Sequence, residues 1–245
     1  MTQPSSHLKK IVAQVKRSTE SKEDSLVVFD LDSTLFDVSP RIQRILHDFS
    51  HDKINIKNFP ESCKIIQKIE TQPHDWGIKD AIIRAGLEAH HPDFHSAIKE
   101  FWKKSFFSNE YLIYDQPYDG AAEYVQKLYD AGATIVYLTG RDIARMGSGS
   151  LQGLLQWKFP VNRPRTELVL KPDKELNDAQ FKSDFFFQQL NKTYSQIWFF
   201  ENEPVNIDLV RKEHPKVEVV FFKSTHSGLS IPPKDLPTIM HYLLD

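Results

Sequence analysis

Short apolar runs recur along the chain, and they are separated by segments in which apolar residues return every three or four positions. The runs predict buried strands over 26–30, 134–138, 167–170, 197–200 and 217–222. Strands that are apolar throughout and alternate with amphipathic helices are typical of a parallel sheet with helices on both faces. The pattern therefore predicts an α/β fold.

Two helices of this fold can be placed from the spacing of apolar residues. Near the start of the chain, four apolar residues fall at i, i+3, i+4 and i+7, which predicts a leading helix over 6–18. These four are Leu8, Ile11, Val12 and Val15. A second amphipathic pattern covers 120–131, and Gly132 marks its end.

A long stretch after the first strand interrupts the alternation of strands and helices. Its apolar spacing predicts mostly helix. The helical patterns cover 41–49, 62–69, 79–89 and 94–107. Because a structureless loop of that length is uncommon inside a compact domain, we expect an inserted helical domain, residues 38–114. The core would then consist of residues 1–37 and 115–245.

Composition and charge narrow the class of protein. With 40% hydrophobic and 12% aromatic residues the chain is expected to be globular, and a net charge of -2 gives no field that would attract nucleic acid. There is no run of about 18 apolar residues to span a bilayer, and the N-terminus lacks an apolar signal segment. The single cysteine, Cys63, fits a reducing compartment. We therefore expect a cytoplasmic protein without nucleic-acid or membrane partners; the oligomeric state stays open.

Polar residues gather where the predicted strands end. They are Asp30 and Asp32 after the first strand, Thr139, Gly140 and Arg141 after the second, and Glu201, Asn202, Glu203 and Asn206 after the fourth. A lysine precedes the fourth strand, either Lys171 or Lys182. Parallel strands end at one edge of a sheet, and ligands bind beyond that edge. The sequence therefore predicts a binding site there.

The order of these motifs resembles that of the haloacid dehalogenase-like (HAD) hydrolases. The resemblance lies in D-x-D-S-T (residues 30–34) after an apolar strand, T-G-R (139–141) after the next, a lysine, and an acidic cluster after the fourth strand. It implies a Rossmann-like parallel core with a helical cap inserted after the first strand. It also implies a phosphatase acting on a small phosphorylated metabolite. An acid at position 32 disfavours dehalogenation, because the family's dehalogenases lack one there.

The resemblance also implies roles for individual residues. Asp30 would be the nucleophile that forms an aspartyl phosphate, and Asp32 the general acid and base. Two carboxylates repel a phosphate dianion, so the site needs cations. Mg²⁺ would bind a side-chain oxygen of Asp30, the backbone carbonyl of Asp32 and an acid from the fourth strand. Thr139 and the lysine would stabilise the transferring phosphoryl group. Residues that could contact the substrate are Gly140, Arg141 and Lys171.

Three points stay open at this stage. Lys182 fits the family position of the motif lysine better than Lys171. In the fourth motif the family carries aspartates, whereas this chain has Glu201 and Asn202 in register, with Glu203 as an alternative metal ligand. The neutral side chain of Asn202 would weaken Mg²⁺ binding. The chain could also be a phosphomutase, or a catalytically weak phosphate-binding or regulatory protein.

The segment MGSGSLQG, residues 146–153, contains three glycines shortly after the T-G-R motif. It lacks the Gly-Lys-Ser/Thr ending of a phosphate-binding loop and the spacing of a dinucleotide-binding motif. We expect a flexible turn there.

Overall fold

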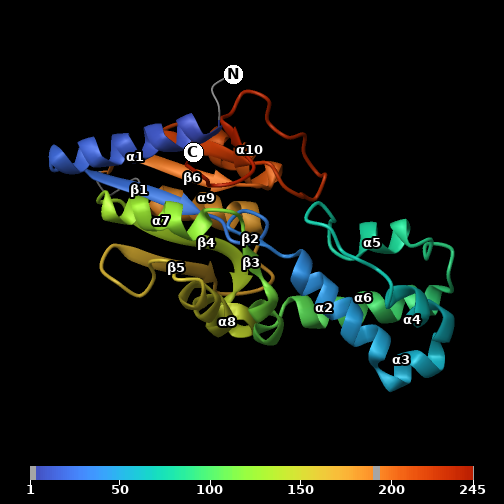
Figure 1. The fold of residues 1–245 in the computed structure, drawn as a ribbon. Helices are drawn as coiled ribbons and strands as arrows, with labels where there is room; N and C mark the ends of the chain where they lie inside the picture. Colours follow the sequence, from blue (N-terminus) through green and yellow to red (C-terminus); the bar gives the residue numbers. More distant parts are fainter. Residues whose placement is uncertain (1–3, 190–193, 245) are drawn as a thin grey trace.

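The computed structural model describes residues 4–189 and 194–244, which form a parallel sheet with helices on both faces and a helical insertion at one end (Figure 1). Within the described residues, the sheet has six strands in the order β5-β4-β1-β6-β7-β8. Every neighbouring pair of these strands is parallel. The strands are β1 (Asp24–Phe29), β4 (Thr134–Asp142), β5 (Thr166–Lys171), β6 (Tyr194–Glu201), β7 (Val217–Phe222) and β8 (Thr238–Ile239). The predicted α/β class is confirmed. The two residues of β8 are too few for a periodic pattern, and the sequence did not predict this strand.

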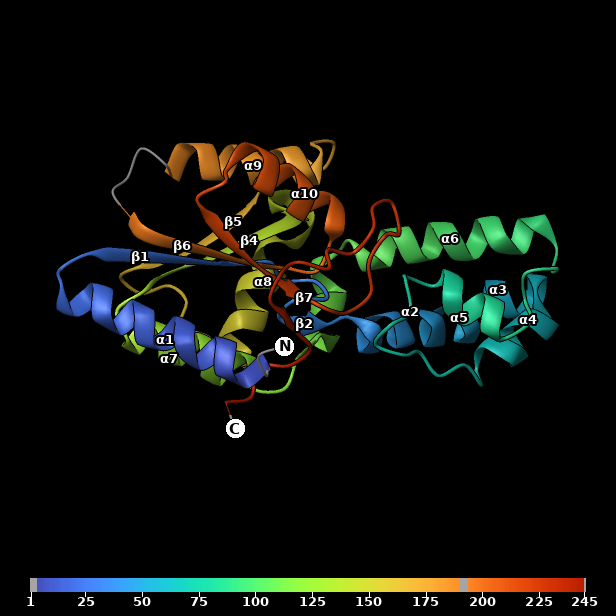
Figure 2. The ribbon, with the colours of Figure 1, turned by 90° about the horizontal axis from the view of Figure 1, so that it is seen from above.

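Helices cover both faces of the sheet (Figure 2). One face carries α1 (Pro4–Glu20), α7 (Ala121–Asp130) and α8 (Ile143–Gln156), and the other carries α9 (Asp178–Gln189) and α10 (Pro204–Glu213). Strand β1 lies between two neighbours and is buried on both faces: Val27 and Phe29 join the first apolar cluster, and Leu26 and Val28 the second. No helix in the described ranges has the length and apolar character needed to cross a membrane.

The insertion is a helical unit with an apolar core of its own, lying beside the carboxyl edge of the sheet (Figures 1 and 2). Its elements are α2 (Ser39–His51), α3 (Lys53–Asn58), α4 (Pro60–Ile66), α5 (Lys79–Arg84), α6 (Pro92–Phe106) and the 3₁₀ helix η1 (Asn109–Tyr114). Its two ends meet in a short antiparallel ribbon of β2 (Phe36–Asp37) and β3 (Gln116–Pro117). The sequence did not predict this ribbon, because each strand has only two residues.

The glycine-rich segment 146–153 lies within α8, so the expectation of a flexible turn there is wrong. One glycine has a packing role. A Cβ at Gly149 would lie 2.8 Å from the Asn109 carbonyl oxygen and 2.9 Å from Leu112 Cδ1. Glycine therefore allows α8 to pack directly against η1, and this contact stabilises the helix against its low intrinsic propensity.

Candidate active site

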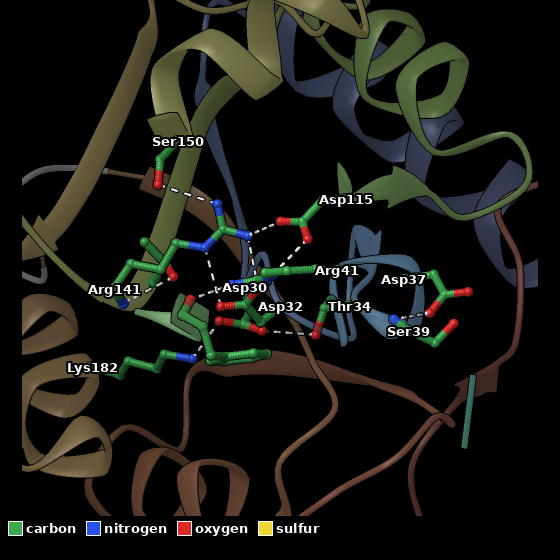
Figure 3. A network of polar contacts seen from close by, with 12 residues as sticks. Asp30, Asp32, Thr34, Asp37, Ser39, Arg41, Asp115, Arg141, Ser150 and Lys182 are labelled. Carbon is green, nitrogen blue, oxygen red and sulfur yellow. Dashed lines mark hydrogen bonds and ion pairs between the residues drawn. The ribbon is translucent and has the colours of Figure 1, made fainter. Parts of the chain in front are cut away.

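The carboxyl ends of β1, β4 and β6 meet at one edge of the sheet because β1 pairs with both of the other strands. Asp30 directly follows β1, Thr139 lies near the end of β4, and Glu201 ends β6. Figure 3 shows Asp30 and Asp32 at this edge, with Lys182 and Arg141 reaching them from different elements. Residues far apart in the sequence are thereby brought together.

A tight turn after β1 orients the first motif. Ser33 has a φ of 61°, a left-handed conformation that is unfavourable for most residues other than glycine. The turn is closed by a hydrogen bond of 2.8 Å from the Ser33 N–H to the Phe36 carbonyl oxygen. Thr34 Oγ1 lies 3.0 Å from Asp30 Oδ2 and donates to it. The turn thus fixes the Asp30 carboxylate at the mouth of the strand.

Lys182 on α9 bridges two buried carboxylates. Its Nζ donates to Asp30 Oδ1 at 2.7 Å and to Glu201 Oε2 at 2.6 Å. Burial, reinforced by the Glu201 carboxylate and opposed by Lys182, raises the pKa of Asp30 to about 7. Burial lowers the pKa of Lys182, but the charges of Asp30 and Glu201 outweigh it and hold that pKa above its usual value. Lys182 therefore stays a cation beside Asp30.

Both carboxylate oxygens of Glu201 are engaged by donors of the chain itself. Oε1 accepts from the backbone N–H groups of Asn202 and Glu203, each at 3.0 Å. Oε2 accepts from Lys182 and, at 3.2 Å, from Asn206 Nδ2. The Glu201 side chain is fully buried. In this arrangement Glu201 holds Lys182 and orders the turn after β6.

Asn202 faces the first motif. Its Nδ2 donates to the Thr225 carbonyl oxygen at 2.7 Å, which fixes the orientation of the amide. Its Oδ1 lies 3.0 Å from Thr34 Oγ1, the hydroxyl that is also 3.0 Å from Asp30 Oδ2. A hydroxyl has one hydrogen and donates it to one oxygen at a time, so the two oxygens retain unused acceptor capacity. An oxygen pair of this kind fits a hard cation such as Mg²⁺.

The set of possible metal ligands is small. Among the described residues, no three His, Cys, Asp or Glu side chains group into a metal site. A cation at this edge would therefore depend on a mixed set of carboxylate, amide and backbone oxygens, with water completing the shell.

Asp32 belongs to a network of four charged side chains (Figure 3). Arg141 Nη2 lies 2.7 Å from both Asp32 Oδ1 and Asp115 Oδ2. Arg41 pairs with Asp32 and, through Nε at 2.7 Å, with Asp115. Burial raises the pKa of Asp32, but Arg141 and Arg41 outweigh it and hold that pKa well below its usual range. At Asp115 burial prevails over the same two arginines and raises the pKa to about 6.

Sequence reasoning missed Arg41 and Asp115. Arg41 lies in the first turn of α2 and Asp115 just before β3, positions where charged residues are normally solvated. Their exposed fractions are only 0% and 3%. No local pattern distinguishes them from surface charges, because their burial results from the meeting of the two ends of the insertion.

The other predicted residues are placed as follows. Thr139 lines the cavity above the site, and its Oγ1 accepts from the Arg141 N–H at 3.2 Å. Gly140 lies against Asp178: a Cβ there would be 2.3 Å from Asp178 Oδ2. Lys171 donates to Asp178 Oδ1 at 2.5 Å and to a nearby loop carbonyl, and it does not line the cavity. Glu203 accepts from the Ser227 N–H and hydroxyl, each at 2.8 Å.

A sequence model of the haloacid dehalogenase-like hydrolases matches residues 25–159, more than half of the chain. Among solved structures, a predicted phosphoglycolate phosphatase from Haemophilus somnus 129PT has a TM-score of 0.53 at 13% identity, with 89% of this chain and 95% of that chain covered. A hydrolase from Streptococcus pneumoniae TIGR4 has a TM-score of 0.52 at 12% identity, with 83% and 94% covered. Likeness at these identities shows a shared fold. No curated protein sequence matches the chain. With its motifs, its fold and the match over more than half its length in agreement, the chain belongs to the haloacid dehalogenase-like hydrolases.

Proposed function

We propose that the chain is a Mg²⁺-dependent phosphatase that hydrolyses monoesters of phosphoric acid through a covalent intermediate on Asp30. The observation that carries the proposal is the placement of the Asp30 carboxylate between the Lys182 ammonium and the Thr34 hydroxyl, facing a cavity. A carboxylate oriented in this way can attack phosphorus, and the ammonium group stabilises charge on the transferring phosphoryl group. Thr139, on the neighbouring strand, supplies a hydroxyl to the same cavity.

The residues that would hold Mg²⁺ are Asp30, Asn202 and, through its backbone carbonyl, Asp32. When bound, the ion neutralises charge between the carboxylates and the phosphate dianion. Glu201 was a second ligand candidate from the sequence. Since each of its oxygens accepts from two donors of the chain, whereas each Asp30 oxygen accepts from one, we assign Glu201 to the positioning of Lys182 instead.

Asp32 would transfer protons at the leaving oxygen and the attacking water. Its pairing with Arg41 and Arg141 favours the carboxylate form, which accepts a proton from water in the second step. Protonation of the leaving alcohol in the first step requires a protonated Asp32, and the two guanidinium groups oppose that form. Arg141 lies 4% exposed and is engaged by Asp32, Asp115 and Ser150, so we assign it to the support of Asp32 rather than to the substrate.

The helical insertion, residues 38–114, would act as a cap over the core formed by residues 1–37 and 115–245. Support comes from the cavity, which is lined both by the residues at the sheet edge and by the insertion. A cap in this place excludes water from the transferring phosphoryl group and contacts the rest of the substrate. Caps of this kind suit small phosphorylated molecules.

The test is hydrolysis of p-nitrophenyl phosphate with and without Mg²⁺, in the wild type, in Asp30→Asn and in Asp184→Asn. Asp184 is an exposed carboxylate on α9 and serves as the matched control. We expect Mg²⁺-dependent release of inorganic phosphate by the wild type and the control, and a loss of at least about 10³-fold in Asp30→Asn. Transfer of the phosphoryl group to a second alcohol without release of phosphate would indicate a mutase. Binding of phosphate without turnover would indicate a catalytically weak binding protein.

A further inference from the structure

The space above Asp30 is much larger than a phosphoryl group needs. The cavity has a volume of about 850 Å³, within the range of sites that bind drug-sized organic molecules. Asp30, Thr139 and Asn202 line one end of it, and residues of the insertion form the opposite wall. A substrate held by its phosphoryl group at Asp30 therefore extends its organic part toward the insertion.

The wall that the insertion contributes is strongly apolar. Trp76 and Ile83 line the cavity although 45% and 46% of their surfaces are exposed. Other apolar residues of this wall are Ile78, Ile82, Ile98, Trp102, Phe106 and Phe107. Large apolar side chains that face solvent together often mark a binding surface. The wall thus offers apolar contacts to the alcohol part of the substrate.

A few polar residues of the insertion also line the cavity. The buried Asp75 carboxylate is engaged by the Arg84 guanidinium at 2.6 and 2.8 Å. Trp102 lines the cavity, and its Nε1 is buried without a hydrogen-bond partner among the described residues. The charged residues Lys79, Glu88 and Lys99 are exposed to solvent. Against the apolar part of the wall, a polyhydroxylated group would lose water without gaining matching hydrogen bonds.

The aromatic part of the wall is shaped by close packing. Trp102 and Phe106 lie with ring centroids 5.2 Å apart, and Phe106 and Phe107 meet edge to face at 5.1 Å. Gly77, with a φ of +57°, brings the backbone against the Trp102 ring, where a Cβ would be only 3.3 Å from Cζ2. Ring surfaces held in this way suit another ring as a partner.

From this geometry, and resting on the proposed phosphatase function, we propose that the natural substrate is a phosphate monoester whose alcohol carries a ring-sized apolar group. The apolar wall of the insertion binds that group while the sheet edge binds the phosphoryl end. Sugar phosphates and small hydroxy-acid phosphates are then poor substrates, because they leave the apolar wall in contact with water or with unpaired hydroxyl groups.

The first test compares esters of primary alcohols, so that the chemistry of the leaving group is matched. The substrates are 2-naphthylmethyl phosphate, ethyl phosphate, glucose 6-phosphate and phosphoglycolate. We expect kcat/KM for the naphthylmethyl ester to exceed that of the ethyl ester by at least about 10²-fold, and the two polar substrates not to exceed the ethyl ester. A higher kcat/KM for glucose 6-phosphate or phosphoglycolate than for the naphthylmethyl ester would overturn the proposal.

The second test uses a matched pair of substitutions in the insertion. Ile83 and Ile54 are both exposed isoleucines, at 46% and 68%, but only Ile83 lines the cavity. We expect Ile83→Asn to lower the ratio of kcat/KM between the naphthylmethyl and ethyl esters about tenfold, and Ile54→Asn to leave that ratio unchanged. Equal ratios in the two variants would contradict the proposal.

Calorimetry separates failure of this proposal from failure of the phosphatase function. The wild type is titrated with the unreactive analogues benzylphosphonate and ethylphosphonate in the presence of Mg²⁺. We expect at least about tenfold tighter binding of the benzyl compound, with a negative heat-capacity change. If no ester is hydrolysed, the phosphatase function fails, and the titration alone decides the binding preference. Equal affinities for the two phosphonates would refute that preference.

Discussion

Lys182 and Lys171 are both buried lysines near strand ends, but their ammonium groups meet different partners. Lys182 donates to Asp30 and Glu201, whereas Lys171 donates to Asp178 and to carbonyl oxygens of the loop after β5. In the proposed mechanism, a cation next to the Asp30 carboxylate stabilises the transition state. A cation that closes a loop acts on local stability.

At the residue scale this difference gives a prediction for two matched substitutions. Lys182→Met removes the positive charge beside Asp30, and we expect kcat to fall by at least about 10²-fold, the usual loss for a group that stabilises transition-state charge. Lys171→Met should lower kcat far less and should instead weaken the loop after β5. Steady-state kinetics and hydrogen exchange of residues 171–178 distinguish the two effects. A larger loss of kcat in Lys171→Met than in Lys182→Met would contradict the assignment.

At the scale of single elements, the glycines of α8 differ in what surrounds them. Gly149 lies against η1, where a Cβ would be 2.8 Å from a backbone carbonyl oxygen, whereas a Cβ at Gly153 would have no neighbour within 4 Å. We expect Gly149→Ala to lower the free energy of unfolding by about 1–3 kcal/mol through overpacking. Gly153→Ala should raise it by about 0.5–1 kcal/mol through helix propensity. Urea denaturation measures both changes, and equal signs would contradict the packing of α8 on η1.

The ionic network at the root of the insertion connects several elements. Arg41 belongs to α2, Asp115 precedes β3, and Asp32 and Arg141 belong to the core. Asp115 holds one guanidinium with each of its oxygens, at 2.7 Å in both cases. Removing it leaves the buried Arg41 and Arg141 guanidinium groups with Asp32 as their one carboxylate partner in the described part of the chain.

We therefore expect Asp115→Ala to lower the free energy of unfolding by about 3–5 kcal/mol, the usual loss when one member of a buried ionic group is removed. Glu61→Ala serves as the control, because Glu61 pairs with Lys64 on the surface, where such a pair contributes about 1 kcal/mol or less. Chemical denaturation of both variants provides the measurement. Similar losses of unfolding free energy in the two variants would mean that the buried network adds no more stability than a solvated ion pair.

At the scale of the whole molecule, the candidate metal site joins the ends of β1 and β6 in the centre of the sheet. A ligand that binds only the folded chain stabilises all of it, by about 2.7 kcal/mol at a concentration of one hundred times its Kd. We expect Mg²⁺ to raise the midpoint of urea denaturation and EDTA to reverse the effect. Asn202→Asp should lower the Mg²⁺ concentration at half-maximal stabilisation, because a carboxylate binds the ion more tightly than an amide.

Asp30→Asn should raise that Mg²⁺ concentration, since it removes a charged oxygen. Calcium, which accepts larger coordination shells, provides a comparison ion. Stabilisation by Mg²⁺ that is identical in the wild type, Asn202→Asp and Asp30→Asn would place the ion elsewhere in the molecule.

Much of the fold could be predicted because its signals are local. The strand over 217–222 was predicted with the bounds of β7, and the helix over 120–131 closely matches α7. The leading helix is longer than predicted, because only its apolar face produces a periodic signal. The strands of two residues were missed, and the helical glycines of α8 were misinterpreted because packing against η1 outweighs their low propensity.

Sequence patterns were enough to predict the order of the main strands and helices, the place of the insertion, and the motifs at the strand ends. Each of these depends on neighbouring residues and on the rule that parallel strands end at one edge. Three features depend on how the elements pack in space: which lysine meets Asp30, which residue after β6 faces the first motif, and the joint burial of Arg41 and Asp115. Such contacts join residues 152, 168 and 74 positions apart, for Lys182 with Asp30, Thr34 with Asn202 and Arg41 with Asp115. Their geometry follows from the packing of whole elements, which no local pattern encodes.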